Sequence, residues 1–228
     1  MWQPRPPHEQ GKEPIIAKPE ERLIYHITHI DNLPAILQDG CLWSDLEVQR
    51  TVNRRTVIGY GAIKKRRLEE LPVHCHPGTF VGHYVPFYFC PRSPMLYVIH
   101  RRNAELTYQG GQDRIIHLVS RIRIAVELAE ERPWAYSDVN AGGRYARFSN
   151  DLAAFDELVD SKAVKATVWN DPTVKERKQA EFLVHRQFLW NGILVIGVIN
   201  QSVADEVARL LPEDGHCPKV LVKPDWYY

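Results

Sequence analysis

Apolar residues alternate with polar ones, or follow one another without a break, in several short segments that predict β-strands. The clearest segments lie at residues 22–28, 79–89, 115–119, 178–184, 192–199 and 219–223. Aromatic residues fill the second segment, which we interpret as a pair of strands ended by the prolines that follow. Residues 121–130 either extend the strand before them or form a helix.

The spacing of apolar residues predicts short helices at residues 31–40, 62–71 and 203–211. The first can be capped by Asp31 or Asn32 and ends at Gly40, and Ser202 can cap the last. These helices are few and lie mostly early, whereas strands dominate the second half of the chain. The pattern therefore predicts an α+β fold with a mixed or antiparallel central sheet and a few short helices.

The composition is that of an ordinary globular protein. The 228 residues are enough for one substantial core, and 29 Lys and Arg nearly balance 28 Asp and Glu. The first 20 residues are rich in proline and polar side chains, so we expect a flexible leader at residues 1–20 and a single domain at residues 21–228. No segment is long and apolar enough to span a membrane, and we expect no membrane partner.

Cysteine and histidine do not occur in the patterns of metal or disulfide sites. The four cysteines, at positions 41, 75, 90 and 217, include no Cys-x-x-Cys pair, which favours a reducing, cytoplasmic location. His74, Cys75, His76 and His83 do not have the spacing of a tetrahedral zinc site. We therefore expect no bound metal.

One acidic residue interrupts an otherwise apolar strand. Glu181 begins the segment that continues as Phe182-Leu183-Val184, and it would share a face with Leu183 and His185. Burial of an unpaired carboxylate is unfavourable, so Glu181 either points to solvent from the strand end or is a catalytic group in a cleft. The strand pattern alone leaves both interpretations open.

Two segments rich in basic residues could contact a nucleic acid despite the balanced net charge. One covers residues 50–67, and the other is the 141–148 loop, where arginines alternate with aromatic side chains. This composition suits the phosphates and stacked bases of a single strand, but it equally suits a solvated face or a packed loop. The side chains in question are Arg54, Arg55, Arg66, Arg67, Arg144, Tyr145 and Arg147.

Five blocks of the chain, in order, resemble the DarT family of bacterial toxins that ADP-ribosylate DNA. They are Tyr25-His26-Ile27-Thr28-His29-Ile30-Asp31-Asn32-Leu33, Ile63-Lys64-Lys65-Arg66-Arg67, Val85-Pro86-Phe87-Tyr88-Phe89, Pro91-Arg92-Ser93-Pro94-Met95 and Lys178-Gln179-Ala180-Glu181-Phe182-Leu183. The resemblance extends from about residue 22 to the C-terminus. It implies an ADP-ribosyltransferase fold related to the PARP and diphtheria-toxin type, with NAD as co-substrate and thymine in single-stranded DNA as the usual acceptor.

The resemblance also implies roles for individual residues. Glu181 matches the catalytic glutamate, and Arg67 or its neighbour Arg66 matches the catalytic arginine, with Arg67 preferred. The expected NAD contacts are His26, Thr28, Asn32, Arg66, Tyr88 and Arg92. The expected DNA contacts are Arg54, Arg55, Arg144, Tyr145, Arg147 and Lys178. A toxin of this family implies a macrodomain antitoxin as partner, and we expect the chain itself to be a monomer.

The residue types suit this chemistry. Cleavage of the nicotinamide glycosidic bond develops positive charge on the ribose, which Glu181 would stabilise by accepting a hydrogen bond from the 2′-hydroxyl. Arg67 stays protonated near neutral pH, so it would stabilise developing negative charge and pair with Glu181. Single-stranded DNA is a suitable substrate because base pairing in a duplex hides the reacting edge.

Three alternatives remain open. The acceptor could be guanine in DNA, a base in RNA or a protein side chain. The chain could instead be a non-enzymatic single-stranded nucleic-acid-binding module, although such a module has little use for Glu181 beside phosphates. It could also be a phosphotransferase that uses His26 and Arg92 on a 2′-phosphate, a reaction that does not require the glutamate.

Overall fold

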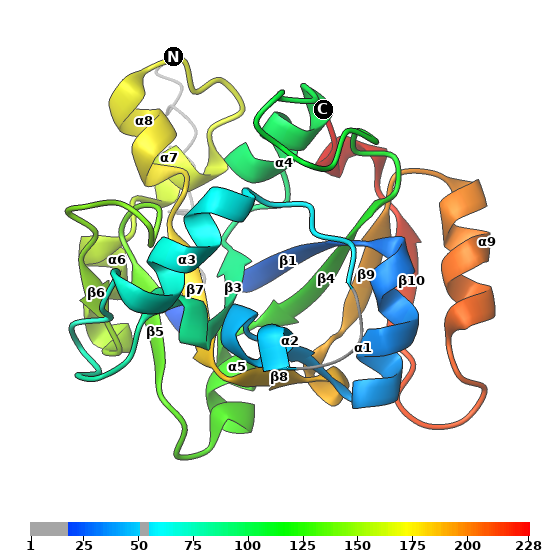
Figure 1. The fold of residues 1–228 in the computed structure, drawn as a ribbon, viewed down its shortest axis with the longest axis horizontal. Helices are drawn as coiled ribbons and strands as arrows, with labels where there is room; N and C mark the ends of the chain where they lie inside the picture. The colour runs from blue at the N-terminus through cyan, green and yellow to red at the C-terminus, as the bar shows by residue number, and fades with distance from the viewer. Residues whose placement is uncertain (1–17, 51–54) are drawn as a thin grey trace, which may run out of the picture.

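An eight-stranded sheet forms the centre of the computed structural model, which describes residues 18–50 and 55–228 (Figure 1). Most of the expected leader and the predicted DNA contact Arg54 lie outside the described residues. The strands of the sheet are β1 (Leu23–His29), β3 (Tyr84–Tyr88), β4 (Ile115–Arg121), β5 (Trp134–Ser137), β6 (Phe148–Ser149), β7 (Glu181–His185), β9 (Val195–Val198) and β10 (Lys219–Val222).

The strands lie in the order β10-β9-β4-β1-β3-β7-β5-β6, and neighbours are antiparallel except for the parallel pair β9 and β10. A second, two-stranded sheet pairs β2 (Cys41–Trp43) with β8 (Gln187–Leu189). A mainly antiparallel sheet combined with short helices confirms the predicted α+β class.

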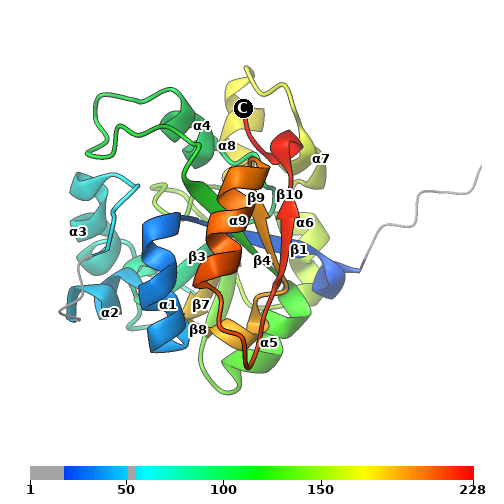
Figure 2. The same cartoon turned by 90° about the vertical axis from the view of Figure 1, so that its right-hand side faces the viewer.

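Short helices surround the sheet. They are α1 (Leu33–Asp39), α2 (Asp45–Arg50), α3 (Gly61–Glu69), α4 (Pro94–His100), α5 (Ile122–Ala129), α6 (Phe155–Leu158), α7 (Ser161–Lys165), α8 (Pro172–Arg177) and α9 (Gln201–Leu210). Single 3-10 turns occur at Pro19–Glu21, Ile30–Asn32, Val81–His83, Leu152–Ala154, Trp190–Gly192 and Pro224–Trp226. Helices α7, α8 and α4 gather at the end of the molecule where the C-terminus lies, and α9 covers the β9–β10 edge (Figures 1 and 2).

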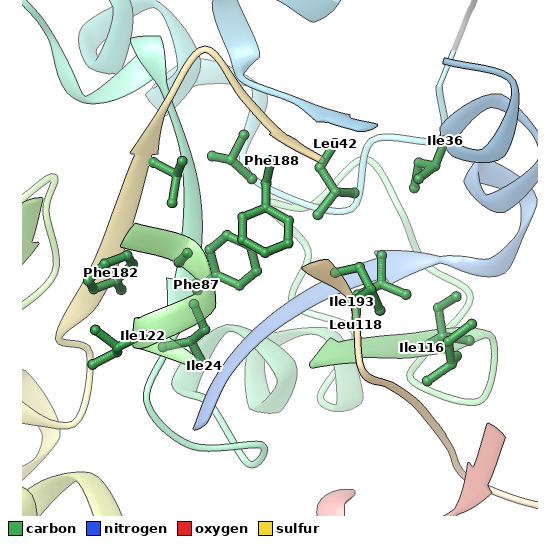
Figure 3. Packing of buried hydrophobic residues seen from close by; sticks show 14 of the residues in the cluster. Ile24, Ile36, Leu42, Phe87, Ile116, Leu118, Ile122, Phe182, Phe188 and Ile193 are labelled. Carbon is green, nitrogen blue, oxygen red and sulfur yellow. The ribbon is translucent and has the colours of Figure 1, made fainter. Parts of the chain in front are cut away.

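The main hydrophobic core packs the sheet against α1, α5 and β8 (Figure 3). Phe87 of β3 and Phe188 of β8 meet at its centre, with ring centroids 4.9 Å apart. Phe182 of β7 points into this core, while Leu183 packs on the opposite face with Tyr84 in a second cluster. Both faces of β7 are therefore covered, so a side chain at the start of this strand is also enclosed by protein.

The central sheet is weakly joined between β1 and β3. These strands share a single residue pair, Tyr25 with Tyr88, whereas β1 is paired with β4 over its whole length. Pro86 in the middle of β3 has no N–H to donate toward β1. Its carbonyl instead accepts a hydrogen bond from Nδ1 of His26, at 2.8 Å. A side chain thus replaces a backbone bond at the junction of the two halves of the sheet.

Several predictions about local structure are wrong in detail. Residues 79–89 form a 3-10 turn and one strand rather than two strands, and residues 121–130 become helix α5. Asn200, not Ser202, caps α9, with its side chain accepting from the Val203 amide at 3.0 Å. Helices α5–α9 all lie in the second half, so strands do not dominate there. The missed helices α6–α8 are too short to show a helical repeat in the sequence.

Candidate active site

Glu181 is buried and both of its carboxylate oxygens are held. It is the first residue of β7, and only 1% of it is exposed. One oxygen, Oε1, accepts a hydrogen bond from the backbone N–H of Ala141 at 3.0 Å, and Oε2 accepts one from the Arg67 guanidinium at 3.1 Å. The interpretation that Glu181 points to solvent is therefore wrong.

The backbone of Glu181 is anchored by a serine that the sequence analysis did not identify. Ser137, at the end of β5, is fully buried, and its hydroxyl oxygen accepts the Glu181 N–H at 3.1 Å. The same hydroxyl donates to the carbonyl of Val139 at 2.7 Å. Ser137 thereby fixes both the start of β7 and the loop that supplies the Ala141 amide. The sequence around Ser137 carries no recognisable signal for this role.

Arg67, and not Arg66, is the arginine that contacts Glu181. The Arg67 side chain is 14% exposed, while that of Arg66 is 53% exposed and pairs with Glu70 one helical turn later, at 3.5 Å. Adjacent residues point about 100° apart on a helix, so only one of them can face the sheet from α3. This placement does not favour the predicted contact between Arg66 and NAD.

Burial opposes the positive charge of Arg67, but the neighbouring charge and hydrogen bond of Glu181 outweigh it and raise the pKa of Arg67. The guanidinium is therefore protonated at any pH of interest. A buried carboxylate and a buried guanidinium together avoid the penalty that either would bear alone. The ion pair explains why an acidic residue can begin an apolar strand.

Tyr88 extends this site across the sheet. It lies opposite Glu181 in the β3–β7 register and opposite Tyr25 in the β1–β3 register. Burial, followed by the charge of Glu181, raises the pKa of the Tyr88 hydroxyl, with Arg67 acting in the opposite direction. Tyr88 therefore keeps its proton and presents a neutral hydroxyl beside the ion pair.

His26 lies at the junction between the two halves of the sheet. Its Nδ1 must be the donor in the bond to Pro86, because a carbonyl can only accept. Burial lowers the pKa of His26, against the opposing effect of that hydrogen bond. The imidazole is therefore neutral near pH 7, which leaves Nε2 as a hydrogen-bond acceptor.

Thr28 and Asn32 form a small buried network. The Asn32 amide nitrogen donates to the Thr28 hydroxyl at 3.0 Å and to the Thr56 carbonyl at 2.9 Å. The Asn32 amide oxygen accepts the Thr56 N–H at 2.7 Å. The Asn32 side chain therefore fastens the segment that starts at residue 55 to the beginning of α1, rather than capping that helix. All three of these hydrogen bonds stay within the protein, an arrangement that does not favour the predicted contact between Asn32 and NAD.

Two predicted DNA contacts lie in the interior instead of on the surface. Lys178 is 3% exposed, and its ammonium group donates to the Val164 carbonyl at 2.7 Å and to the Cys90 sulfur at 3.5 Å. Arg55 is mostly buried and pairs with Asp39. Because their charges are already engaged within the fold, these placements do not favour contacts with phosphates.

The 141–148 loop has only some of the exposed arginine and aromatic side chains that the sequence predicts for it. Tyr145 is 82% exposed, and the guanidinium of Arg144 lies 5.7 Å from its ring centre. Arg147 is exposed but pairs with Asp138 at 2.7 Å. The same loop supplies the Ala141 amide to Glu181, so a surface suited to a base or phosphate is directly linked to the buried carboxylate.

Arg92 lies beyond the end of β3, with its guanidinium 4.4 Å above the ring of Tyr228.

In the part of the chain that the structure describes, no cluster of three or more His, Cys, Asp or Glu side chains could hold a metal ion. None of the described helices is long and apolar enough to cross a membrane.

The chain matches known proteins over nearly its full length. The family model described as "ssDNA thymidine ADP-ribosyltransferase, DarT" matches residues 25–228. A relative from Thermus sp. (strain 2.9), named DNA ADP-ribosyl transferase, is 43% identical over 213 residues, which is 92% of this chain and 98% of the relative. A fusion of a DNA ADP-ribosyl transferase with a DNA ADP-ribosyl glycohydrolase, from Thermosipho africanus, is 38% identical over 80 residues, 35% of this chain and 19% of the relative.

Solved structures agree with these matches. Thermus sp. 2.9 DarT in complex with ADP-ribosylated ssDNA has a TM-score of 0.82 and 42% identity, covering 92% of this chain and 98% of that chain. Thermus sp. 2.9 DarT in complex with NAD+ has a TM-score of 0.77 and 38% identity, covering 93% and 100%. With a family model that matches most of its residues and a buried glutamate–arginine pair at the expected positions, the chain belongs to the DarT family of DNA ADP-ribosyltransferases.

Proposed function

We propose that this protein transfers ADP-ribose from NAD+ to thymine in single-stranded DNA, with Glu181 and Arg67 as its catalytic pair. The observation that carries the proposal is the fixed orientation of the Glu181 carboxylate between the Ala141 amide and Arg67. A carboxylate oxygen has two acceptor sites, so each oxygen of Glu181 can accept one more hydrogen bond. A ribose hydroxyl can therefore bind without displacing either protein donor.

Glu181 and Arg67 each stabilise a different charge that develops during the reaction. Glu181 stabilises the positive charge that develops on the ribose as the nicotinamide bond breaks. Arg67 pairs with the Glu181 carboxylate and stabilises the negative charge that develops on the thymine base as its N3 proton is lost. The neutral His26, through its free Nε2, accepts a hydrogen bond from a hydroxyl of NAD+ and holds it at the junction of the sheet.

The acceptor is proposed on the description of the family and on the Thermus relative that was solved with ADP-ribosylated ssDNA. The exposed Arg144 and Tyr145, one loop away from Glu181, suit a single strand with an unpaired base. A base in a duplex would have its N3 edge hidden by pairing.

We further propose that the protein acts as a monomeric single domain in the cytoplasm and that a macrodomain antitoxin opposes it. The Thermosipho relative, whose name joins the transferase to a DNA ADP-ribosyl glycohydrolase, supports an enzyme of opposite activity as the partner. The cysteines of the described residues are free, which is in keeping with a reducing compartment.

The test is mass spectrometry of short single-stranded oligonucleotides, one for each base type, after incubation with protein and NAD+. We expect one ADP-ribose to be added only to thymine-containing strands. The Glu181→Gln variant keeps an acceptor for the Ala141 amide but loses the charge, so it should transfer at least about a hundredfold more slowly. Addition to guanine strands would replace the proposed acceptor, and no addition to any strand would refute DNA as the substrate.

A further inference from the structure

The backbone amide that holds Glu181 belongs to the loop of a β-hairpin at one edge of the central sheet (Figure 1). Strands β5 and β6 pair in antiparallel fashion through two residue pairs, and residues 138–147 connect them. Strand β6 is the last strand at this edge and contains two residues. Because so short a ladder gives a loop little support, other contacts must fix the path of residues 138–147.

Asp138 closes this loop with its side chain. Asp138 directly follows β5, and Arg147 directly precedes β6. The Asp138 N–H donates to the Arg147 carbonyl at 3.3 Å, and the Arg147 N–H donates to Oδ1 of Asp138 at 2.9 Å. The carboxylate therefore takes the place that a backbone carbonyl has in a strand ladder. Its other oxygen, Oδ2, accepts a hydrogen bond from Nε of Arg147 at 2.7 Å.

The closed loop presents the Ala141 amide to the catalytic carboxylate. Ala141 is 1% exposed and packs in the same cluster as Leu183 of β7. Just beyond it the chain turns, with the Gly143 N–H donating to the Asn140 carbonyl at 2.8 Å. The Ala141 N–H then reaches Oε1 of Glu181 at 3.0 Å. The direction of this N–H depends on the path of the loop, and the contact between Asp138 and Arg147 closes that path.

The two partners of the closing contact are exposed to different extents. The side chain of Asp138 is 13% exposed, whereas that of Arg147 is 67% exposed. An exposed ion pair contributes little to stability, but a hydrogen bond from a backbone N–H to a shielded carboxylate is charge-assisted and stronger. The bond that closes the loop is therefore the one to the Arg147 backbone, and any side chain other than proline at position 147 would keep it.

We propose that Asp138 is a positioning residue for the transfer reaction, which acts through the loop and the Ala141 amide on the carboxylate of Glu181. The inference rests on the proposed function and deepens it, because the carboxylate must meet the ribose in a fixed orientation. A displacement of about 1 Å can slow such a reaction about a hundredfold. The proposal assigns loop closure at position 147 to the backbone, which separates it from the DNA contact predicted for the Arg147 side chain.

The first test is steady-state kinetics with NAD+ and a thymine-containing oligonucleotide. Asp138→Ala removes the acceptor and should lower kcat about tenfold to a hundredfold, while the KM values for NAD+ and DNA change less than about threefold. Asp138→Asn keeps an oxygen that can accept the Arg147 N–H, so it should restore most of kcat. Arg147→Ala keeps the backbone N–H and should also retain kcat.

Asp151→Ala is the matched control for these variants. It removes a carboxylate that also accepts a backbone N–H, from Ala153 at 2.9 Å, but lies outside the loop, so kcat should be unchanged. If Asp138 only orients the Arg147 side chain toward DNA, Asp138→Ala and Arg147→Ala would both raise the KM for DNA and leave kcat unchanged. That result, or equal kcat in Asp138→Ala and Asp151→Ala, would overturn the proposal.

Hydrogen exchange read by mass spectrometry tests the loop without the reaction. In the absence of NAD+ and DNA, residues 138–147 should exchange their amide protons faster in Asp138→Ala than in wild type, and at the wild-type rate in Asp138→Asn. If exchange changes in this way but wild type modifies no strand, the proposed function fails and the closing contact stands. If wild type modifies thymine but the loop exchanges equally in wild type and Asp138→Ala, the reaction stands and the positioning role fails.

Discussion

At the scale of single residues, the orientation of one guanidinium decides which of two adjacent arginines can act in catalysis. Arg67 donates to Glu181, while Arg66 projects from the same helix into solvent and pairs with Glu70. The two variants Arg67→Ala and Arg66→Ala therefore form a matched pair. They remove the same side chain from neighbouring positions of α3, one inside the site and one outside it.

We expect Arg67→Ala to lower kcat by about 10²- to 10³-fold, because the developing negative charge on the base loses its stabilising group. It should also destabilise the fold by about 3–5 kcal/mol, since it leaves the Glu181 charge buried without its partner. Arg66→Ala should change stability by less than about 1 kcal/mol and leave kcat unchanged. Steady-state transfer assays and urea unfolding measure both effects, and equal activity of the two variants would contradict the assignment.

The Ser137 hydroxyl gives a second prediction at this scale. Ser137→Ala leaves the Glu181 N–H and the Val139 carbonyl without their partner, which should lower stability by about 1–3 kcal/mol. Because the carboxylate then loses its fixed position, kcat should fall while the KM for NAD+ changes little. Ser149→Ala on β6 is the control: its hydroxyl accepts the Asp151 amide, away from Glu181, so activity should be retained. An unchanged kcat in Ser137→Ala would rule out a positioning role.

At the scale of secondary-structure elements, Asn32 joins the start of α1 to the segment that begins at residue 55. Three hydrogen bonds to Thr28 and Thr56 depend on this one side chain. In Asn32→Ala the Thr56 backbone groups lose their partners, and we expect the 55–60 segment to exchange its amide protons faster. The segment leads into α3, which carries Arg67, so the KM for NAD+ should rise.

Asn200→Ala serves as the comparison for this prediction. Asn200 caps α9, and its removal should lower stability by about 1 kcal/mol without any effect on NAD+. Hydrogen exchange read by mass spectrometry and a KM measurement on both variants test the difference. If both variants raise the KM to the same extent, loss of stability rather than loss of the Asn32 network is the cause.

The elements that the sequence predicts are those with enough residues to show a repeat. Helices α1 and α9 begin and end close to their predicted limits because each buries one face against the core, and strand β1 does so with buried side chains on both faces. Strand β7 begins at Glu181, later than predicted, because Lys178 still belongs to the turn that ends α8. Helices α7 and α8 contain only one turn or two, and their signal is the single capping aspartate before each, Asp160 and Asp171.

At the scale of the whole molecule, the site depends on contacts that no local pattern contains. The sequence indicates that Glu181 needs a partner, but not that the partner is Arg67 on a helix far earlier in the chain or the amide of Ala141. The resemblance to known enzymes indicates that Glu181 and Arg67 act together, and the fold shows how they come into contact. Lys178 illustrates the converse, because the motif predicts a contact with DNA, whereas the side chain is buried and donates to the Val164 carbonyl.

The junction of the sheet is likewise a property of the whole fold. Pro86 removes a donor from β3, and His26 of β1 replaces it with its ring. Neither residue alone predicts the junction. Together they leave β1 and β3 joined by the single pair Tyr25 and Tyr88, next to the ion pair of Glu181 and Arg67.

Buried histidines also make the stability of the molecule depend on pH, with His117 as the clearest case. His117 lies in β4, fully buried, with Nε2 donating to the Pro91 carbonyl at 3.0 Å and Nδ1 3.2 Å from the Tyr227 hydroxyl. Burial lowers its pKa to about 4, against the opposing effect of its backbone hydrogen bonds. The ordinary pKa of histidine is 6.5, so at a pH below that value His117 binds a proton in the unfolded chain but not in the folded chain. The contribution of His117 to the stability of the fold is therefore complete above pH 6.5 and is lost progressively as the pH falls toward 4.

Urea unfolding of wild type at pH 7, 6 and 5 should show this loss, of which His117 accounts for about 2 kcal/mol by pH 5. His117→Gln cannot titrate, so its stability, although lower at pH 7, should change less across the same range. His100→Gln, at an exposed position on α4, should follow the wild-type curve. Parallel curves for wild type and His117→Gln would mean that folding does not lower the pKa of His117, so that the imidazole binds a proton while it contacts the Pro91 carbonyl and the Tyr227 hydroxyl.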